Sequence, residues 1–177
     1  MTEVNIEEEN AAIAKAYKEL LKVSYTTLSD DDKKLIRSAF DVALDGHKDQ
    51  RRRSGEAYIF HPLAVARIVA KEIGLDATSI AAALLHDVVE DCDDYSIVDI
   101  ERLFGHTVAK IVDGLTKISS LSKEQDMDVS LQAENFRKML LTLNDDVRVI
   151  IIKIADRLHN MQTMDAMRPD KHGKIAS

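Results

Sequence analysis

The stretch ALLHDVVED (residues 83–91) places one histidine and three acidic residues at the end of an apolar segment. Such groups cost free energy in apolar surroundings unless they find partners, so their presence calls for a chemical reason. His86 and Asp87 point about 100° apart on a helix, so both can bind one ion only at the helix edge. A histidine nitrogen with carboxylate oxygens suits Mn²⁺, Fe²⁺ or Zn²⁺ better than Ca²⁺.

Two further polar residues occupy similarly apolar segments. His61 stands at the start of a predicted helix, and Asp156 lies inside the stretch IIIKIADRLHN. Taken singly, each has an ordinary structural interpretation, in which Asp156 pairs with Arg157 or another cation and His61 caps its helix. One divalent ion explains all of these residues together. The predicted metal ligands are therefore His61, His86, Asp87 and Asp156.

Glu90 and Asp91 follow the His-Asp pair by one helical turn. Glu90 is four residues after His86 and three after Asp87, so it shares their face of a helix. This position suits a general base or acid that handles water beside the ion. The alternative is a solvated last turn, although acidic residues at a helix C-terminus oppose the helix dipole. Glu90 and Asp91 are the candidate catalytic residues.

The remaining histidines and the single cysteine carry weaker signals. His47 and His172 lie in polar segments and are predicted to be on the surface, and His106 is predicted to start a helix. His159 follows Asp156 by three residues and can line the site, support a ligand or lie in the core. Cys92 excludes an internal disulfide and suits a reducing cytoplasm. Its acidic neighbours raise a thiol pKa, which disfavours a nucleophilic role.

Composition limits the classes of function that remain. The chain has 177 residues, enough for one domain with a sizeable core, and it is 45% apolar and 31% charged. No segment approaches the roughly 18 apolar residues of a membrane span, and the N-terminus lacks a signal-peptide pattern. The net charge of −7 argues against a general DNA-binding surface. The cluster HKDQRRRSGEAYIFHP can still hold a small anionic ligand, or it can be a solvated loop.

Hydrophobic periodicity predicts an all-α protein, a compact bundle of about seven to nine helices. Ser29 is the predicted N-cap of the second helix, Pro62 suits a first helical turn, and Gly74 closes the helix that follows. Val147, Ile151, Ile154 and Leu158 have the spacing of a helix despite the local preference of isoleucine for strands. The predicted helices cover residues 6–23, 29–44, 61–73, 77–90, 96–104, 106–115, 130–143 and 145–167, with a long loop at 117–128.

Four segments in this order resemble the hydrolase domain of the RelA/SpoT family, which makes and degrades the alarmone (p)ppGpp and belongs to the HD phosphohydrolase superfamily. The segments are RRRSGEAYIFHP, ALLHDVVED, FGHTVAKIVDGLTKI and KIADRLHNMQT. The resemblance covers roughly residues 30–177. It implies an HD domain at 29–177 that forms one compact unit with an N-terminal helix at 1–28. The chain ends at DKHGKIAS, where family members continue towards a synthetase domain, so we expect a fragment of a longer enzyme or a small free-standing hydrolase.

The resemblance also implies roles for individual residues. The reaction is release of pyrophosphate from the ribose 3′ position of (p)ppGpp, which leaves GDP or GTP. The family's metal, usually Mn²⁺, corresponds to the four ligands named above, although another divalent transition metal is possible. Its catalytic acidic pair corresponds to Glu90 and Asp91. Its substrate-binding positions correspond to Arg52, Arg53, Ser54, Tyr58, Lys117, Asn160 and Thr163.

Three positions depart from the family pattern. Arg53 replaces the usual lysine, which keeps the charge and changes its geometry. Ala57 replaces a proline without removing a phosphate donor, and Gln162 replaces an arginine and so removes one cation. None of these changes affects a predicted metal ligand or the acidic pair.

Three other interpretations stay open. An HD phosphohydrolase acting on another nucleotide shares the metal ligands but does not need the Arg-Arg-Ser-Gly-Glu element. A catalytically silent module that binds the alarmone is expected to lose a ligand or the acidic pair. A purely structural bundle leaves the four polar residues unexplained. The sequence leaves open the preferred metal, the acid that moves the proton, the oligomeric state and the activity of this fragment alone.

Overall fold

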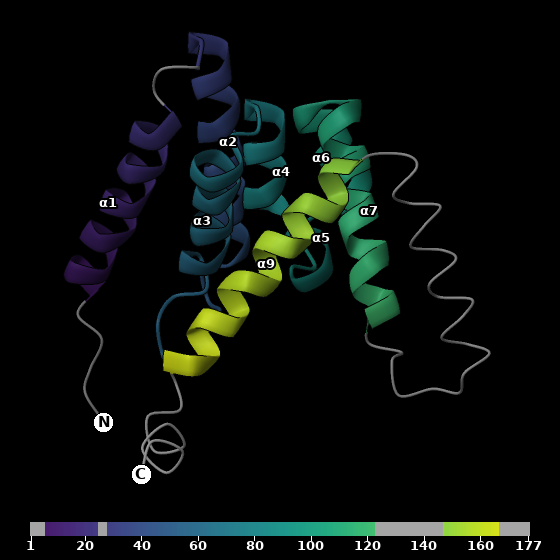
Figure 1. Ribbon diagram of the computed structural model, residues 1–177. Coiled ribbons are helices and arrows are strands. Elements are labelled where there is room, and N and C mark those ends of the chain that lie inside the picture. Colours follow the sequence, from purple (N-terminus) through teal and green to yellow (C-terminus); the bar gives the residue numbers. More distant parts are fainter. Residues whose placement is uncertain (1–5, 25–27, 123–146, 167–177) are drawn as a thin grey trace.

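The computed structural model describes residues 6–24, 28–122 and 147–166, and within them the regular secondary structure is entirely helical (Figure 1). This confirms the predicted all-α class. The predicted helix at 130–143 lies outside the described residues. The elements are α1 (Ile6–Ser24), α2 (Asp30–Gly46), α3 (Phe60–Arg67), the π-helical segment η2 (Ile68–Ile73), α4 (Ala77–Leu85), α5 (Val88–Asp91), α6 (Ile97–Phe104), α7 (His106–Ser122) and α9 (Val147–Ala166).

Side-chain caps fix where several helices begin. The hydroxyl of Ser29 accepts from the amide of Asp32 at 3.1 Å, and the carboxylate of Asp32 accepts from the Ser29 amide at 3.1 Å. Ser96 forms the same reciprocal cap with Asp99 at the start of α6, and the carboxylate of Asp76 accepts from the amide of Ser79 at the start of α4. These caps satisfy amide groups that have no partner inside the helix. The predicted role of Ser29 is confirmed.

The core is built around α4. Ile80, Leu84 and Leu85 are fully buried, and α4 packs against α2, α3 and α7. α1 covers α3 and η2 from the other side, and α6 packs against α7. No described helix combines the length and apolarity needed to cross a lipid bilayer.

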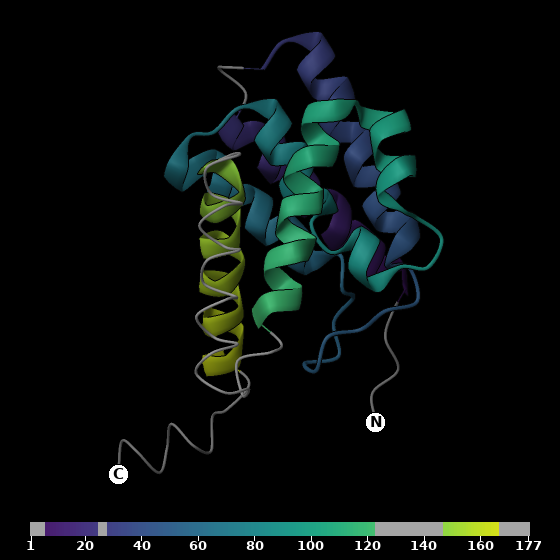
Figure 2. The same cartoon turned by 90° about the vertical axis from the view of Figure 1, so that its right-hand side faces the viewer.

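α9 crosses the bundle obliquely in Figure 1 and contacts α3, η2, α4 and α7. Figure 2 shows it beside α7. The buried face of α9 includes Val149, Ile152 and Ala155. Three of the residues whose spacing predicted this helix lie on its outer face instead: Val147, Ile154 and Leu158 are 58%, 60% and 44% exposed. The helix was predicted correctly, but that spacing marked its exposed face.

Two predicted boundaries differ from the structure, and a third is confirmed. The helix predicted at 77–90 is interrupted between Leu85 and Val88, and the loop predicted from residue 117 is helical as far as Ser122. The helix predicted at 61–73 continues from α3 into η2 and ends where Gly74 adopts a φ of 75°. The end of this helix at Gly74 was therefore predicted correctly; only the π-helical hydrogen bonding of its second half was not.

Candidate metal centre and basic loop

Three parts of the fold bring two histidines and two aspartates together. His61 lies in the first turn of α3, His86 and Asp87 lie between α4 and α5, and Asp156 lies on α9. Their candidate ligand atoms all lie within 4.8 Å of one another. The Oδ1 atom of Asp156 is 2.6 Å from Nε2 of His61 and 3.1 Å from Nε2 of His86. All four residues predicted to bind a metal therefore converge on one point.

The interruption between α4 and α5 explains how two adjacent residues face the same point. Asp87 has φ −103° and ψ −3°, outside regular helix geometry, so the chain turns between His86 and Val88. Its Oδ2 atom lies 2.9 Å from Nε2 of His86. On the continuous helix that we predicted, the two side chains would diverge by about 100°. In the structure the two side chains nevertheless meet at the centre.

Each of the four side chains has a further contact that fixes its orientation. Metal-binding residues commonly depend on such contacts, which hold the ring or carboxylate in place. The pairs are His86 Nδ1 with the carbonyl of Ala83 at 2.6 Å, Asp87 Oδ2 with the hydroxyl of Tyr58 at 2.6 Å, Asp156 Oδ2 with Nζ of Lys153 at 3.2 Å, and His61 Nδ1 with Nδ1 of His159 at 2.7 Å.

The electrostatics of the centre favour a bound cation. Burial raises the pKa of Asp87, but the charge of His86 and hydrogen bonds from His86 and Tyr58 outweigh it, so the pKa is lowered. The pKa of Asp156 is also lowered, since hydrogen bonds from His61 and His86 outweigh the effect of its burial. Both aspartates are thus ionised at neutral pH. Burial disfavours a charged His86, yet the two aspartates raise its pKa well above the usual value. A cation can take the place of that proton.

The candidate acidic pair lies on α5, directly after the turn. Glu90 is half-buried and Asp91 is exposed. The amide of Asp91 donates to the carbonyl of Asp87 at 2.8 Å, and its own carbonyl accepts from Nε2 of Gln50 at 2.9 Å. The first of these hydrogen bonds closes the turn of α5, and the second attaches the end of this short helix to Gln50, which directly precedes the arginines.

The three adjacent arginines have three different environments. Arg51 forms a two-pronged ion pair with Glu9 of α1, and its backbone pairs with Ala57 across the loop. Arg52 donates through Nη2 to Asn160 at 3.2 Å and to Thr163 at 3.1 Å. Arg53 is exposed. Gly55, with a φ of 93°, lets the chain reverse between Arg52 and Glu56, whose backbones pair at 2.9 Å. We call residues 51–57 the basic loop.

The other predicted substrate-binding residues divide into two groups. Tyr58 is half-buried and reaches Asp87, so it joins the basic loop to the metal centre. Asn160 and Thr163 lie on α9, next to Arg52. Ser54 is exposed at the tip of the basic loop. Lys117 is on α7, where its ammonium pairs with Asp113 at 3.0 Å rather than with any other predicted site residue.

Sequence reasoning missed the burial of His47. We predicted a surface position, but the side chain is only 2% exposed and packs on the ring of Tyr58 with centroids 4.7 Å apart. Its Nδ1 atom lies 2.8 Å from Oε1 of Gln50. The signal was present in the spacing, because His47 continues the buried stripe of α2 through Phe40 and Ala43. The polar residues that follow it obscured this pattern. His172 lies outside the described residues.

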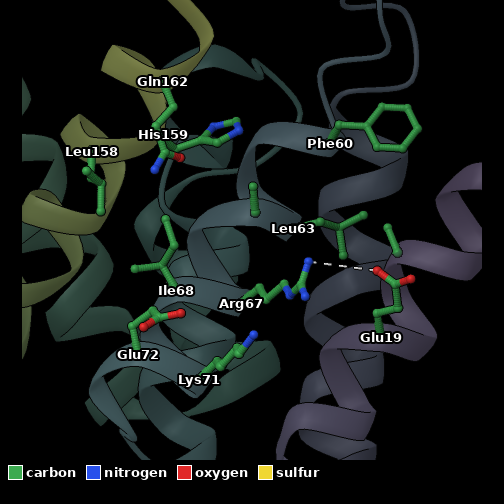
Figure 3. Close-up of a pocket in the computed structure, with 12 residues that line it drawn as sticks. Glu19, Phe60, Leu63, Arg67, Ile68, Lys71, Glu72, Leu158, His159 and Gln162 are labelled. Atoms are coloured by element: carbon green, nitrogen blue, oxygen red, sulfur yellow. Dashed lines mark ion pairs between the residues drawn. The ribbon is translucent and has the colours of Figure 1, made fainter.

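A cavity of about 680 Å³ lies beside the centre, between α1, α3, η2 and α9 (Figure 3). Phe60, Leu63 and Leu158 supply apolar walls, and Arg67 pairs with Glu19 at 3.9 Å across it. His159 lines the cavity and also contacts His61, so one imidazole touches both the cavity and a candidate ligand.

Comparison with known proteins places this arrangement in context. Residues 39–177 match the protein family described as HD domain. The bifunctional (p)ppGpp synthase/hydrolase SpoT of Escherichia coli (strain K12) is 47% identical over 160 residues, which is 90% of this chain and 22% of that protein. The probable guanosine-3′,5′-bis(diphosphate) 3′-pyrophosphohydrolase of Synechocystis sp. is 51% identical over 142 residues, 80% of this chain and 18% of that protein. The chain thus spans about a fifth of the length of these curated relatives.

A solved structure agrees with the sequence comparison. It is described as a metazoan ortholog of SpoT that hydrolyzes ppGpp, and it is 29% identical to this chain with a TM-score of 0.60. The similarity covers 78% of this chain and 72% of that structure. The shared architecture therefore extends well beyond the residues around the His-Asp pair.

Proposed function

Because the chain belongs to the HD-domain family and is a relative of the RelA/SpoT hydrolases, we propose that it hydrolyses the 3′-pyrophosphate of (p)ppGpp. The products are pyrophosphate and GDP or GTP. The observation that carries this proposal is the convergence of His61, His86, Asp87 and Asp156 beside a basic loop. An anionic phosphate and a divalent cation both fit this combination of charges.

The four residues suit a divalent transition metal, and we propose Mn²⁺. Two ionised carboxylates balance the charge of one such ion, and two imidazole nitrogens complete a mixed nitrogen and oxygen donor set. A bound ion supplies Lewis-acid chemistry, which makes water more acidic and polarises a phosphoryl oxygen. His61, His86, Asp87 and Asp156 are already oriented by their other contacts, so little rearrangement is needed to bind it.

We assign the proton transfer to the acidic pair. Water attacks the phosphorus bonded to the ribose 3′ oxygen, the bond between that phosphorus and oxygen breaks, and the 3′ hydroxyl gains a proton. Glu90 is half-buried one turn after Asp87, and it takes the proton of the attacking water. Asp91 is the alternative base. Gln50 holds the carbonyl of Asp91 at 2.9 Å and so supports the position of the whole short helix.

Substrate binding is assigned to the basic loop and α9. Arg52 has little exposed surface and reaches Asn160 and Thr163, so these three residues form one wall. A guanidinium there can bind phosphate through two hydrogen bonds or stack on a base. Arg53 and Ser54 are exposed and supply further donors at the mouth of the site. A local cluster of this kind is compatible with a chain whose net charge is −7.

We also propose that the protein acts in the cytoplasm. The substrate is a soluble nucleotide, and a lone buried thiol at Cys92 is typical of a reducing compartment. The negative net charge makes DNA an unfavourable partner.

The direct test is release of pyrophosphate from ppGpp by the purified chain, first with Mn²⁺ and then with EDTA. We expect turnover with Mn²⁺ and its loss after chelation. Turnover that EDTA leaves unchanged would contradict the metal-dependent reaction. Binding of ppGpp without turnover would favour a silent regulatory module. Absence of both binding and turnover would favour an HD phosphohydrolase acting on another nucleotide.

A further inference from the structure

His159 makes the contact that fixes the ring of His61. Their Nδ1 atoms are 2.7 Å apart, and the two rings stack with centroids 5.0 Å apart and an interplanar angle of 26°. His159 follows Asp156 by three residues, so one face of α9 carries both a candidate ligand and the support of a second ligand. His159 itself is not among the four convergent residues.

The chemistry of imidazole determines what this contact does. The Nε2 atom of His61 faces the centre, 2.6 Å from Asp156 and 3.9 Å from Asp87. Coordination of a metal through Nε2 requires an unprotonated Nε2, so the ring proton must lie on Nδ1. That N–H then donates to Nδ1 of His159. In most metal-binding histidines the corresponding acceptor is a carboxylate, a backbone carbonyl or water.

We infer that His159 is a positioning residue, which accepts the Nδ1 proton of His61 and thereby holds His61 in the tautomer and orientation needed to bind a metal. This inference rests on the metal centre of the proposed function. It adds a residue that neither the ligand set nor the acidic pair includes.

The surroundings explain why a neutral acceptor suits this position. The carboxylates of Asp87 and Asp156 already balance one divalent ion, so an anionic acceptor would add an unbalanced negative charge. An anion at this position would also attract Arg52, which lies close enough to influence His159 electrostatically. Capture of Arg52 would remove it from the substrate. A histidine accepts the same hydrogen bond without either effect.

The cavity completes the hydrogen bonding of His159. When Nδ1 accepts from His61, the remaining proton of a neutral His159 lies on Nε2. His159 lines the 680 Å³ cavity, where water can accept from that N–H (Figure 3). The only deeply buried side-chain nitrogen or oxygen without a partner among the described residues is Nε2 of His47. Nε2 of His159 is thus not one of the deeply buried unpaired atoms, and water can reach it.

The test compares substitutions that separate the acceptor from the shape of the side chain. His159→Asn places a neutral oxygen near the position of Nδ1, whereas His159→Leu and His159→Phe remove the acceptor, and the phenylalanine keeps a ring. Met161→Gln changes an exposed residue of the same helix and serves as the control. The measurement is the Kd for Mn²⁺ of the metal-stripped chain by calorimetry, with folding of each variant checked by circular dichroism.

We expect His159→Leu and His159→Phe to weaken Mn²⁺ binding by about 10-fold to 100-fold, the range typical of lost support for a metal ligand. His159→Asn is expected to retain most of the affinity, and Met161→Gln all of it. Raising Mn²⁺ to saturation should restore much of the ppGpp turnover of the leucine variant, with an unchanged KM for the nucleotide. If His159→Leu misfolds, the phenylalanine variant gives the same comparison.

Two results would overturn the inference. One is wild-type Mn²⁺ affinity in folded variants without an acceptor. The other is equal loss in the asparagine and leucine variants, which would assign the effect to shape. In both cases the wild-type chain still binds Mn²⁺ and hydrolyses ppGpp, so the proposed function stands. A wild-type chain that binds no divalent metal would instead overturn the proposed metal centre together with this inference.

Discussion

The metal centre and the basic loop lie side by side, but they are held in place in different ways. In the centre, His61 and His86 are 1% and 4% exposed, and every candidate ligand contacts another fixed group. In the basic loop, Arg53 and Ser54 are exposed, and two guanidinium groups supply most of the side-chain contacts. The centre is organised in advance by the core, whereas the loop keeps donors available for a ligand.

This difference suits the two proposed ligands, a metal ion in the centre and a nucleotide at the basic loop. A metal ion needs several donors at fixed positions, and burial between α3, α4 and α9 supplies them. A nucleotide with several phosphates benefits from long cationic side chains that adapt to it, and exposure keeps those side chains hydrated until it binds. Tyr58 is the direct link between the regions, because it follows the basic loop in sequence and donates to Asp87.

The largest expected effect comes from removing a ligand. Asp87→Asn keeps the shape and the hydrogen-bond acceptor for Tyr58 but removes a charge from the centre. We expect kcat for ppGpp to fall by more than about 100-fold, since loss of a ligand exceeds the effect of losing its supporting contacts. Steady-state release of pyrophosphate measures this. Asp93→Asn makes the same chemical change at an exposed position, and it should leave kcat unchanged. Retained turnover in the Asp87 variant would remove Asp87 from the ligand set.

In the basic loop we expect an effect on KM instead of kcat. Arg52→Ala removes hydrogen bonds to a charged ligand, each worth about 1.5–3 kcal/mol, so KM should rise about 10-fold to 100-fold. Arg52→Lys keeps the charge but cannot form two parallel hydrogen bonds. Its KM should lie between the KM of the wild type and that of Arg52→Ala. Lys48→Ala removes a cation from the same region and should change KM only slightly. A fall in kcat with unchanged KM would place Arg52 in the chemistry and would break the division of roles.

The link between the regions is tested by Tyr58→Phe. The change deletes only the hydroxyl that donates to Asp87 at 2.6 Å, and the ring can still pack on His47. We expect Mn²⁺ affinity to fall about 10-fold, at the lower end of the range for supporting contacts. Tyr95→Phe is the matched control, because it deletes a hydroxyl bonded to Asp45 at 2.7 Å, away from the centre. Equal effects of both substitutions would contradict a specific role of Tyr58.

The smallest effect is expected where the basic loop meets α1. Glu9→Gln removes the charge that pairs with Arg51. Exposed ion pairs contribute little free energy, so KM for ppGpp should rise by less than about fivefold. The rise should shrink further in high salt, which screens the pair in the wild type as well. Glu7→Gln, on an exposed turn of the same helix, is the control. A larger change would mean that α1 fixes the loop as firmly as the core fixes the centre.

Sequence reasoning found the centre more easily than its supports. His61, His86, Asp87 and Asp156 stand out because each has the wrong polarity for its apolar segment. Lys153 does not stand out, since a lysine on an amphipathic helix is unremarkable. His159 was noticed only for its spacing from Asp156, and that spacing left open whether it lines the site, supports a ligand or lies in the core. Their importance depends on which face of α9 meets α3 and α4, and the spacing of Val147, Ile154 and Leu158 pointed to the wrong face.

The turn after α4 is a second feature that sequence reasoning did not predict. Residues 77–90 contain no glycine or proline, so local sequence predicts one continuous helix. The break at His86 and Asp87 is stabilised by contacts with Tyr58 and Asp156, which are distant in sequence.

The substrate-binding residues were assigned through the family resemblance. That resemblance fits Arg52, Asn160 and Thr163, which lie together, better than it fits Lys117, which pairs within its own helix.

Because of the position of Cys92, the rate at which its thiol is alkylated reports local opening of α5. The thiol is 6% exposed directly after α5, and burial together with the charge of Asp91 raises its pKa to about 11. At pH 8 an alkylating reagent should therefore react slowly until α5 detaches, after which the thiol regains an ordinary pKa near 8.5. The labelling rate gives the free energy of that opening. Binding of metal and nucleotide should slow labelling if α5 carries the catalytic base, because ligands that need the closed segment stabilise it.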